Sequence, residues 1–204
     1  RKLAEALPDL GAEYLTAEHV RALRALNDAP IDAVLDEVWG TNRATPAEKL
    51  AEIERWKTKL AGAENANLGA GRVVFNSSCG RCHKLYGEGG ELGPNLTGSD
   101  RQNLDYLLGN IFDPSAVVPA AWRVSTVLLE DGRVLTGVVE DRGNGSLSIA
   151  TADKTVVLPA SDVLDIEQGD ASLMPEGLFK TLTDEQIRDL IGYLQTESAA
   201  AVQR

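Results

Sequence analysis

Both cysteines of the chain and one of its two histidines lie within five consecutive residues, Cys79-Gly80-Arg81-Cys82-His83. This C-x-x-C-H spacing is the attachment signature of c-type haem. Two thiols three positions apart can reach two vinyl groups on one edge of a porphyrin, and the adjacent imidazole can bind the iron. The motif therefore predicts one covalently bound haem c, with Cys79 and Cys82 as attachment points and His83 as proximal axial ligand.

Two other uses of these cysteines stay open at this stage. A thioredoxin-like redox pair normally follows a strand in a βαβ pattern, whereas the preceding segment, Gly71-Arg72-Val73-Val74-Phe75, is typical of a short helix. A structural zinc site needs two more ligands, and only His19 and acidic residues could supply them. Haem attachment uses every chemically active residue of the motif, so it is the favoured interpretation.

Charge and hydropathy limit the partners that this chain can have. The 204 residues carry a net charge of −11, which disfavours nucleic acid and anionic membrane surfaces as partners. No apolar run approaches the roughly 18 residues of a membrane span. The negative charge fits a redox partner with a basic docking patch, and it equally fits simple solubility. The chain starts at Arg1 without a signal peptide, so we expect a mature product or a fragment of a longer protein.

The sequence pattern divides the chain into three regions. Residues 1–65 are predicted to be a helical N-terminal extension, and residues 66–204 to form the haem-carrying domain. Within that domain, residues 122–168 contain five short β-branched runs separated by Asp131-Gly132 and Gly143-Asn144-Gly145, which predicts an inserted small antiparallel sheet or barrel. Such barrels sometimes bind nucleic acid, but this one has few aromatic and many acidic residues, which favours a structural insertion.

Capping patterns predict where several helices begin. Thr45-Pro46-Ala47-Glu48 and Thr183-Asp184-Glu185-Gln186 have the form of capping boxes, and Ser99 with Gln102 predicts the start of a third helix. The spacing of Leu50, Ile53 and Leu60 predicts the buried stripe of the first of these helices. Four glycines after the haem motif predict a flexible loop: Gly87, Gly89, Gly90 and Gly93.

Met174 is the only methionine of the chain. It lies in Ser172-Leu173-Met174-Pro175-Glu176-Gly177, between turn-forming residues just before the last predicted helix. A lone methionine is ordinarily a gap-filler in a core. A thioether in a proline-stiffened loop is better suited to be the sixth ligand of the haem iron. We therefore predict His83/Met174 ligation, which leaves no open iron position and favours electron transfer over oxygen chemistry.

These residues, in this order, resemble a class I cytochrome c. Gly71-x-x-x-Phe75 is similar to the N-terminal helix motif of that family, with Gly71 allowing a close crossing by the C-terminal helix and Tyr193 as the aromatic contact. The resemblance implies that the Pro94 carbonyl accepts the free N–H of the His83 imidazole, and that Met174 is the distal ligand. The fold it implies is a mainly α cytochrome c fold, here with the inserted β sheet or barrel and the N-terminal helical extension.

The chain departs from ordinary class I cytochromes in the long interval between His83 and Met174, which contains the predicted β insertion. With that insertion it resembles the haem-binding domain at the C-terminus of large planctomycete-type proteins. The shared motifs are Gly93-Pro94-Asn95-Leu96, Asp113-Pro114-Ser115, Asp131-Gly132-Arg133 and Ser172 to Leu178. This resemblance implies a module fused behind helical-repeat and dehydrogenase-like domains, and a periplasmic or otherwise extracytoplasmic location in a bacterium.

The expected function is that of a monohaem electron-transfer module and not an enzyme, accepting electrons from a fused or docked dehydrogenase. A haem-based sensor with a displaceable Met174 is the alternative, because the β insertion directly precedes the methionine loop. A peroxidase-like activity is disfavoured, because the sequence offers no distal His or Arg set. Arg101 and Trp122 are candidates for contacts with the haem propionates.

Overall fold

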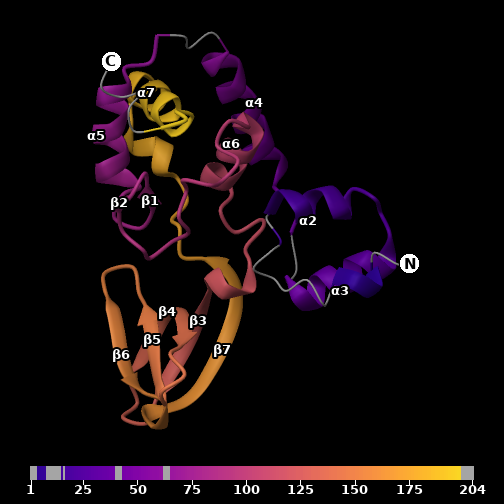
Figure 1. Ribbon diagram of the computed structural model, residues 1–204, viewed down its shortest axis with the longest axis vertical. Helices are drawn as coiled ribbons and strands as arrows, with labels where there is room; N and C mark the ends of the chain where they lie inside the picture. The colour runs from indigo at the N-terminus through magenta and orange to yellow at the C-terminus, as the bar shows by residue number, and fades with distance from the viewer. Residues whose placement is uncertain (1–3, 8–14, 16, 40–42, 62–64, 199–204) are drawn as a thin grey trace. The chain divides into compact units, whose positions relative to one another are not determined.

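The computed structural model describes residues 4–7, 15, 17–39, 43–61 and 65–198, whose elements are labelled in Figure 1. The chain forms two compact units, each made of two separate stretches. The first unit comprises Arg1–Ala44 and Pro114–Leu173, and the second comprises Thr45–Asp113 and Met174–Arg204. The motif Cys79–His83 and Met174 both belong to the second unit.

The N-terminal part of the first unit contains α2 (Ala17–Arg24) and α3 (Ala29–Val38). The side chain of Asp28 caps α3 by accepting from the Ile31 backbone N–H at 3.2 Å, and Pro30 lies in the first turn, where it needs no N–H partner. These helices bury a small core of their own that includes Val20, Ile31, Leu35 and Trp39. A predicted cap at Thr16 lies outside the described residues.

The rest of the first unit is an antiparallel five-stranded sheet with the order β6-β5-β4-β3-β7. Alternate residues of its strands face a core of Val127, Leu129 and Ile149. The five runs predicted from the sequence all form strands. Their bounds are β3 (Arg123–Leu129), β4 (Val134–Asp141), β5 (Ser146–Ala150), β6 (Thr155–Pro159) and β7 (Val163–Ser172), with the short η2 (Ala120–Trp122) before β3 and η3 (Ala160–Asp162) before β7.

Of the two predicted alternatives, an antiparallel sheet or a barrel, the structure confirms the sheet, which is open, with β6 and β7 as its edges (Figure 1). Each edge strand carries a feature that opposes further pairing. β6 ends at Pro159, which has no N–H to donate, and the exposed β7 carries Asp165, Glu167 and Asp170. The description "mainly α" fits the second unit but not the first, which contains this whole sheet.

The second unit packs helices around one core. They are α4 (Ala47–Leu60), α5 (Leu68–Ser78), α6 (Leu104–Phe112) and α7 (Asp184–Leu194), accompanied by the two-residue strands β1 (Lys84–Leu85) and β2 (Glu88–Gly89) and by η4 (Leu178–Thr181). The fully buried residues of the core include Phe75, Leu85, Leu108, Ile187 and Leu190. None of the helices in the described part of the chain is long and apolar enough to cross a membrane.

Helix α4 contributes to this core, although the sequence pattern placed it in the N-terminal extension. Ile53, Trp56 and Leu60 of α4 are buried in the same cluster as residues of α5, α6 and α7. The boundary between residues 65 and 66, and the insertion at 122–168, stay predictions about independently folding parts. Shared core contacts nevertheless tie α4 to the haem-motif helices.

One of the three predicted helix caps is confirmed. Thr183 and Gln186 form a reciprocal capping box at the start of α7. The other two caps are wrong: α4 begins at Ala47, close to the predicted start, but has no side-chain cap, and α6 is capped by Asn103, whose Oδ1 accepts from the Tyr106 backbone N–H at 3.2 Å. Ser99 instead donates its hydroxyl to the Leu96 carbonyl.

Candidate haem-binding site

Helix α5 delivers the first cysteine of the motif. Asn67 caps the helix by accepting from the Ala70 backbone N–H at 3.0 Å, and Cys79 is the C-cap residue, with its N–H bonded to the Phe75 carbonyl. The chain then turns tightly, because the N–H groups of Cys82 and His83 both donate to the Cys79 carbonyl. The two cysteines and the histidine therefore lie in one tight turn at the end of α5.

Helix α7 crosses α5 at Gly71, as the resemblance implied. A Cβ at Gly71 would lie 2.0 Å from the Asp189 carbonyl oxygen and 2.8 Å from the Tyr193 Cβ, so only glycine permits this approach. The Phe75 and Tyr193 rings meet at a centroid distance of 5.6 Å. The prediction of a close crossing with an aromatic contact is confirmed.

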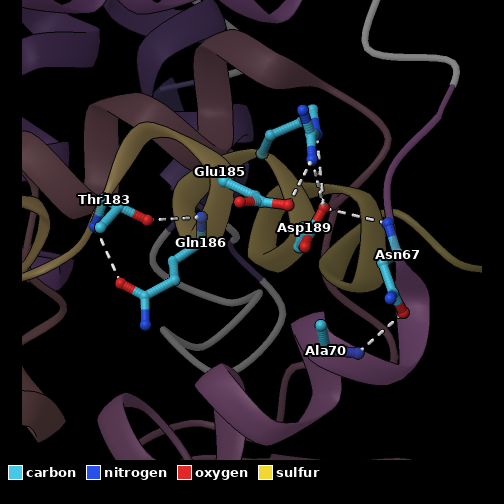
Figure 2. A network of polar contacts seen from close by, with 7 residues as sticks. Asn67, Ala70, Thr183, Glu185, Gln186 and Asp189 are labelled. Carbon is cyan, nitrogen blue, oxygen red and sulfur yellow. Dashed lines mark hydrogen bonds and ion pairs between the residues drawn. The ribbon is translucent and has the colours of Figure 1, made fainter.

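A buried carboxylate ties the start of α5 to α7. The Asp189 side chain, 5% exposed, accepts from the Asn67 backbone N–H at 2.9 Å and from the Arg188 guanidinium at 3.2 Å (Figure 2). Figure 2 also shows the capping box of Thr183 and Gln186 at the start of α7. At the N-terminus of α5, the Ala70 N–H therefore bonds to the Asn67 side chain, and the Asn67 N–H bonds to Asp189 of α7. These two bonds hold the start of α5 against α7.

The His83 imidazole is oriented by Pro94. Its Nδ1 lies 2.8 Å from the Pro94 carbonyl oxygen. A carbonyl can only accept, so Nδ1 carries the proton and Nε2 keeps its lone pair for a metal. Burial lowers the pKa of His83, and the hydrogen bond to Pro94 opposes this shift only in part. The ring is therefore held neutral and in the tautomer that an iron ligand requires.

Three of the four loop glycines, Gly89, Gly90 and Gly93, are closely packed, which contradicts the prediction of a flexible loop at these positions, whereas Gly87 has open space around it. A Cβ at Gly93 would lie 2.8 Å from His83 Cε1. A Cβ at Gly89, whose φ is +110°, would lie 2.1 Å from the His83 carbonyl oxygen, and one at Gly90 would lie 2.1 Å from that of Arg81. These glycines let the main chain wrap around the motif, with β1 and β2 as a minimal hairpin.

The environment of the cysteines bears on the two rival interpretations. Burial, together with the neighbouring Cys82, raises the pKa of the Cys79 thiol to about 11. A thiol–disulfide exchange site needs the opposite shift, because the thiolate is the nucleophile. Among the described residues, no three His, Cys, Asp or Glu side chains gather in a way that could hold a metal ion.

Met174 lies where the chain enters the second unit for the second time. Its half-buried side chain packs against the core cluster that also receives Cys79, Tyr86 and Leu96. The second unit thus contains all four proposed haem-binding groups: the two cysteine thiols, the His83 imidazole and the Met174 thioether. This donor set fits haem c: two free thiols for its vinyl groups, a neutral nitrogen and a sulfur for its iron.

Arg101 has a different setting from the propionate contact considered above. It is buried, and its guanidinium donates to the Leu96 carbonyl at 2.7 Å, the Thr97 carbonyl at 3.1 Å and the Thr196 carbonyl at 2.9 Å. It therefore joins the loop after Pro94 to the end of α7, where a cation suits the helix dipole. An arginine in a polar stretch gives no sequence signal for such a role. Trp122 lies in η2 of the first unit.

Comparison with protein families gives a match to part of the chain. The family described as cytochrome C oxidase, cbb3-type, subunit III, matches residues 66–123. These residues include α5, the haem motif, Pro94 and α6, but not Met174. Comparison with curated proteins gives no significant match. The motif, the oriented histidine and this family match together support a haem-binding domain of the cytochrome c type in this part of the chain.

Proposed function

We propose that this protein is a monohaem c-type cytochrome that transfers electrons and has no substrate chemistry of its own. In this proposal Cys79 and Cys82 hold the haem through thioethers, and His83 and Met174 are the axial ligands. When bound, the haem supplies a one-electron step between Fe(II) and Fe(III). The observation that carries the proposal is the 2.8 Å hydrogen bond from His83 Nδ1 to the Pro94 carbonyl, since it presents Nε2 as an iron ligand directly after the two thiols.

In this proposal the protein's residues hold the haem and its axial ligands in place and take no chemical part in the electron transfer. Pro94 keeps the proton on Nδ1, and the main chain at Gly93 packs closely against the ring. Two axial ligands from opposite ends of the domain sequence leave no position for oxygen or peroxide, which favours electron transfer. Methionine ligation also raises the reduction potential relative to a bis-histidine site.

We further propose that the electron donor is a dehydrogenase, either a domain of the same full-length chain or a docked protein with a basic patch. The net charge of −11 supports attraction to such a patch. The planctomycete-type resemblance supports the fused arrangement and a periplasmic location, since c-type haem is attached outside the bacterial cytoplasm.

Covalent attachment is tested by extraction of the purified, matured protein with acidified organic solvent. We expect the pigment to stay with the polypeptide. Single substitutions Cys79→Ser and Cys82→Ser should each leave one thioether, while the double substitution should release all pigment into the solvent. A pigment that leaves the wild-type protein contradicts covalent attachment.

Axial ligation is tested by optical spectroscopy of Met174→Ala. The oxidised wild-type protein should show the weak far-red band of a methionine–ferric bond, and the variant should lack it and have a lower reduction potential. Leu50→Ala, a change of a half-exposed residue on α4, is the control and should keep both properties. An unchanged band in Met174→Ala contradicts the assignment of Met174.

A haem-based sensor is the second candidate, favoured by one observation. Strand β7 ends at Ser172, two residues before Met174, so a change in the sheet has a short covalent route to the proposed ligand. Rapid binding of carbon monoxide to the reduced wild-type protein would support the sensor. Resistance to carbon monoxide would support electron transfer.

A further inference from the structure

Lys49 joins two sequence motifs whose roles the proposed function leaves unexplained. Its Nζ lies 2.8 Å from Oδ1 of Asp113, in the Asp113-Pro114-Ser115 motif, and 2.7 Å from Oε1 of Glu176, in the methionine loop. The three residues come from α4, the end of α6 and the segment after Met174, all in the second unit. Lys49 also lies outside the residues that match the cytochrome family.

The burial of the three side chains shows which contact fixes the lysine. The Asp113 side chain is fully buried, the Lys49 side chain is 18% exposed, and the Glu176 side chain is 53% exposed. A buried carboxylate requires a cation close by, because an uncompensated buried charge is strongly destabilising. Asp113 therefore holds Lys49 in place, and its ammonium group becomes an anchor for the more exposed Glu176. An ion pair with one partner already ordered loses less side-chain entropy than an ordinary surface pair.

A second contact of α4 fixes the far end of the same loop. The Phe179 ring meets Trp56 of α4 at a centroid distance of 5.6 Å and Phe112 of α6 at 5.3 Å, both edge to face. The loop from Met174 to Phe179 is thus tied down at Glu176 and at Phe179. Pro175 lies directly before Glu176, and Gly177, with φ +76°, lies directly after it, so the connection from Met174 to Phe179 is short and turns at Gly177.

We propose that Lys49 is a positioning residue for the sixth iron ligand: through Glu176 it holds the loop that presents the Met174 thioether. This inference rests on the proposed Met174 ligation and adds to it a residue from the segment before the family match. Its consequence is kinetic, since an external ligand can bind the iron only after Met174 has moved away. Lys49 should therefore slow that displacement.

The test measures the rate at which imidazole replaces Met174 in the oxidised full-length holoprotein, followed at the far-red band. At a pH well above its pKa imidazole is neutral, so a change of protein charge has little effect on its encounter with the site. Glu176→Gln keeps the buried Lys49–Asp113 pair and removes only the charge on the loop. We expect it, and Lys49→Met, to raise the displacement rate by about threefold to tenfold.

The matched control is Lys57→Met on the same helix. Lys57 is also bridged to two carboxylates, Asp105 of α6 at 2.7 Å and Glu54 at 2.9 Å, but neither belongs to the methionine loop. Its displacement rate should stay within about twofold of the wild type. In the double variant Lys49→Met/Glu176→Gln, the rate should equal that of Lys49→Met alone, because both changes break the same link.

Three outcomes overturn the inference, and they are distinguishable. A wild-type protein without the far-red band rejects Met174 ligation, and Lys49 loses its proposed role with it. A wild-type band with equal rates in wild type, Glu176→Gln and Lys49→Met rejects only the role of Lys49. Equal acceleration in Lys57→Met shows that any weakening of α4 has the same effect. Should Lys49→Met fail to fold because the buried Asp113 loses its ion pair with Lys49, Glu176→Gln decides the question.

Discussion

Gly93 leaves no room for a side chain beside the proximal histidine. A Cβ there would lie 2.8 Å from Cε1 and 3.0 Å from Nδ1 of His83. The ring cannot turn away without losing its hydrogen bond to Pro94. We therefore expect Gly93→Ala to lower the free energy of unfolding by about 1–3 kcal/mol, the usual cost of overpacking.

Chemical denaturation of the Gly93→Ala protein checks this expectation. Gly98→Ala is the control, because a Cβ at Gly98 meets no atom within 4 Å and its stability should be unchanged or slightly increased. If both variants unfold at the same denaturant concentration, the packing argument at Gly93 is wrong.

At the residue scale, the sequence predicted local chemistry better than tertiary roles. The C-x-x-C-H motif and the resemblance together placed Pro94 beside His83, and the structure has that contact at 2.8 Å. The glycines of the loop were visible, but their meaning was misjudged, because a sequence shows that a side chain is absent and not which atoms fill its place. The observed roles of Lys49 and Arg101 had no signal in the sequence, since partners of both residues are far away along the chain.

At the element scale, the turn between β3 and β4 makes stability depend on pH. Asp131 accepts from the Arg133 backbone N–H at 3.0 Å and from its guanidinium at 2.8 Å, and these bonds lower the pKa of Asp131. A carboxylate with a lowered folded pKa adds stability above its unfolded pKa, and this stability is lost as pH falls through the folded pKa.

The variant Asp131→Asn tests this contribution. At pH 7 we expect it to unfold at a slightly lower temperature than the wild type, with the difference shrinking towards zero as the pH falls below about 4. Thermal unfolding across that range measures the effect. Asp153→Asn, a change in the turn between β5 and β6, is the control. A difference that grows with acidity would contradict the sign of the argument.

A helix cap was predicted correctly only where the polar side chains of the pattern make the capping hydrogen bonds themselves. Thr183 and Gln186 bond reciprocally, so a pattern local in sequence was enough to find the start of α7. Ser99 donates to the Leu96 carbonyl instead, and Asn103 caps α6. Several polar residues in a row can each serve as a cap, and the competing turn decides which one does.

At the scale of the whole molecule, the strands could be predicted from the sequence, but whether they form an open sheet or a closed barrel could not. Alternation and turn residues located all five strands, because both are local properties. Whether β6 and β7 pair with each other depends on twist and strand length, which short-range patterns do not report. The membership of α4 in the core of the second unit was missed for a similar reason, since its apolar stripe shows that it is buried but not against what.

The role of α4 leads to a test of where the haem-binding part begins. Ile53, Trp56 and Leu60 are at most 8% exposed and pack in the core that includes Phe179. Removing one large core side chain costs about 2–5 kcal/mol, and a domain of this size has only about 5–15 kcal/mol in total. A chain that begins at Thr45 should therefore keep a folded haem-binding unit, whereas a chain that begins at Ala66 should lose most of its stability. Haem retention and thermal unfolding of the two shortened proteins measure the difference. Equal stability would place the boundary at 65/66, as the sequence pattern first indicated, and would reduce α4 to an accessory helix.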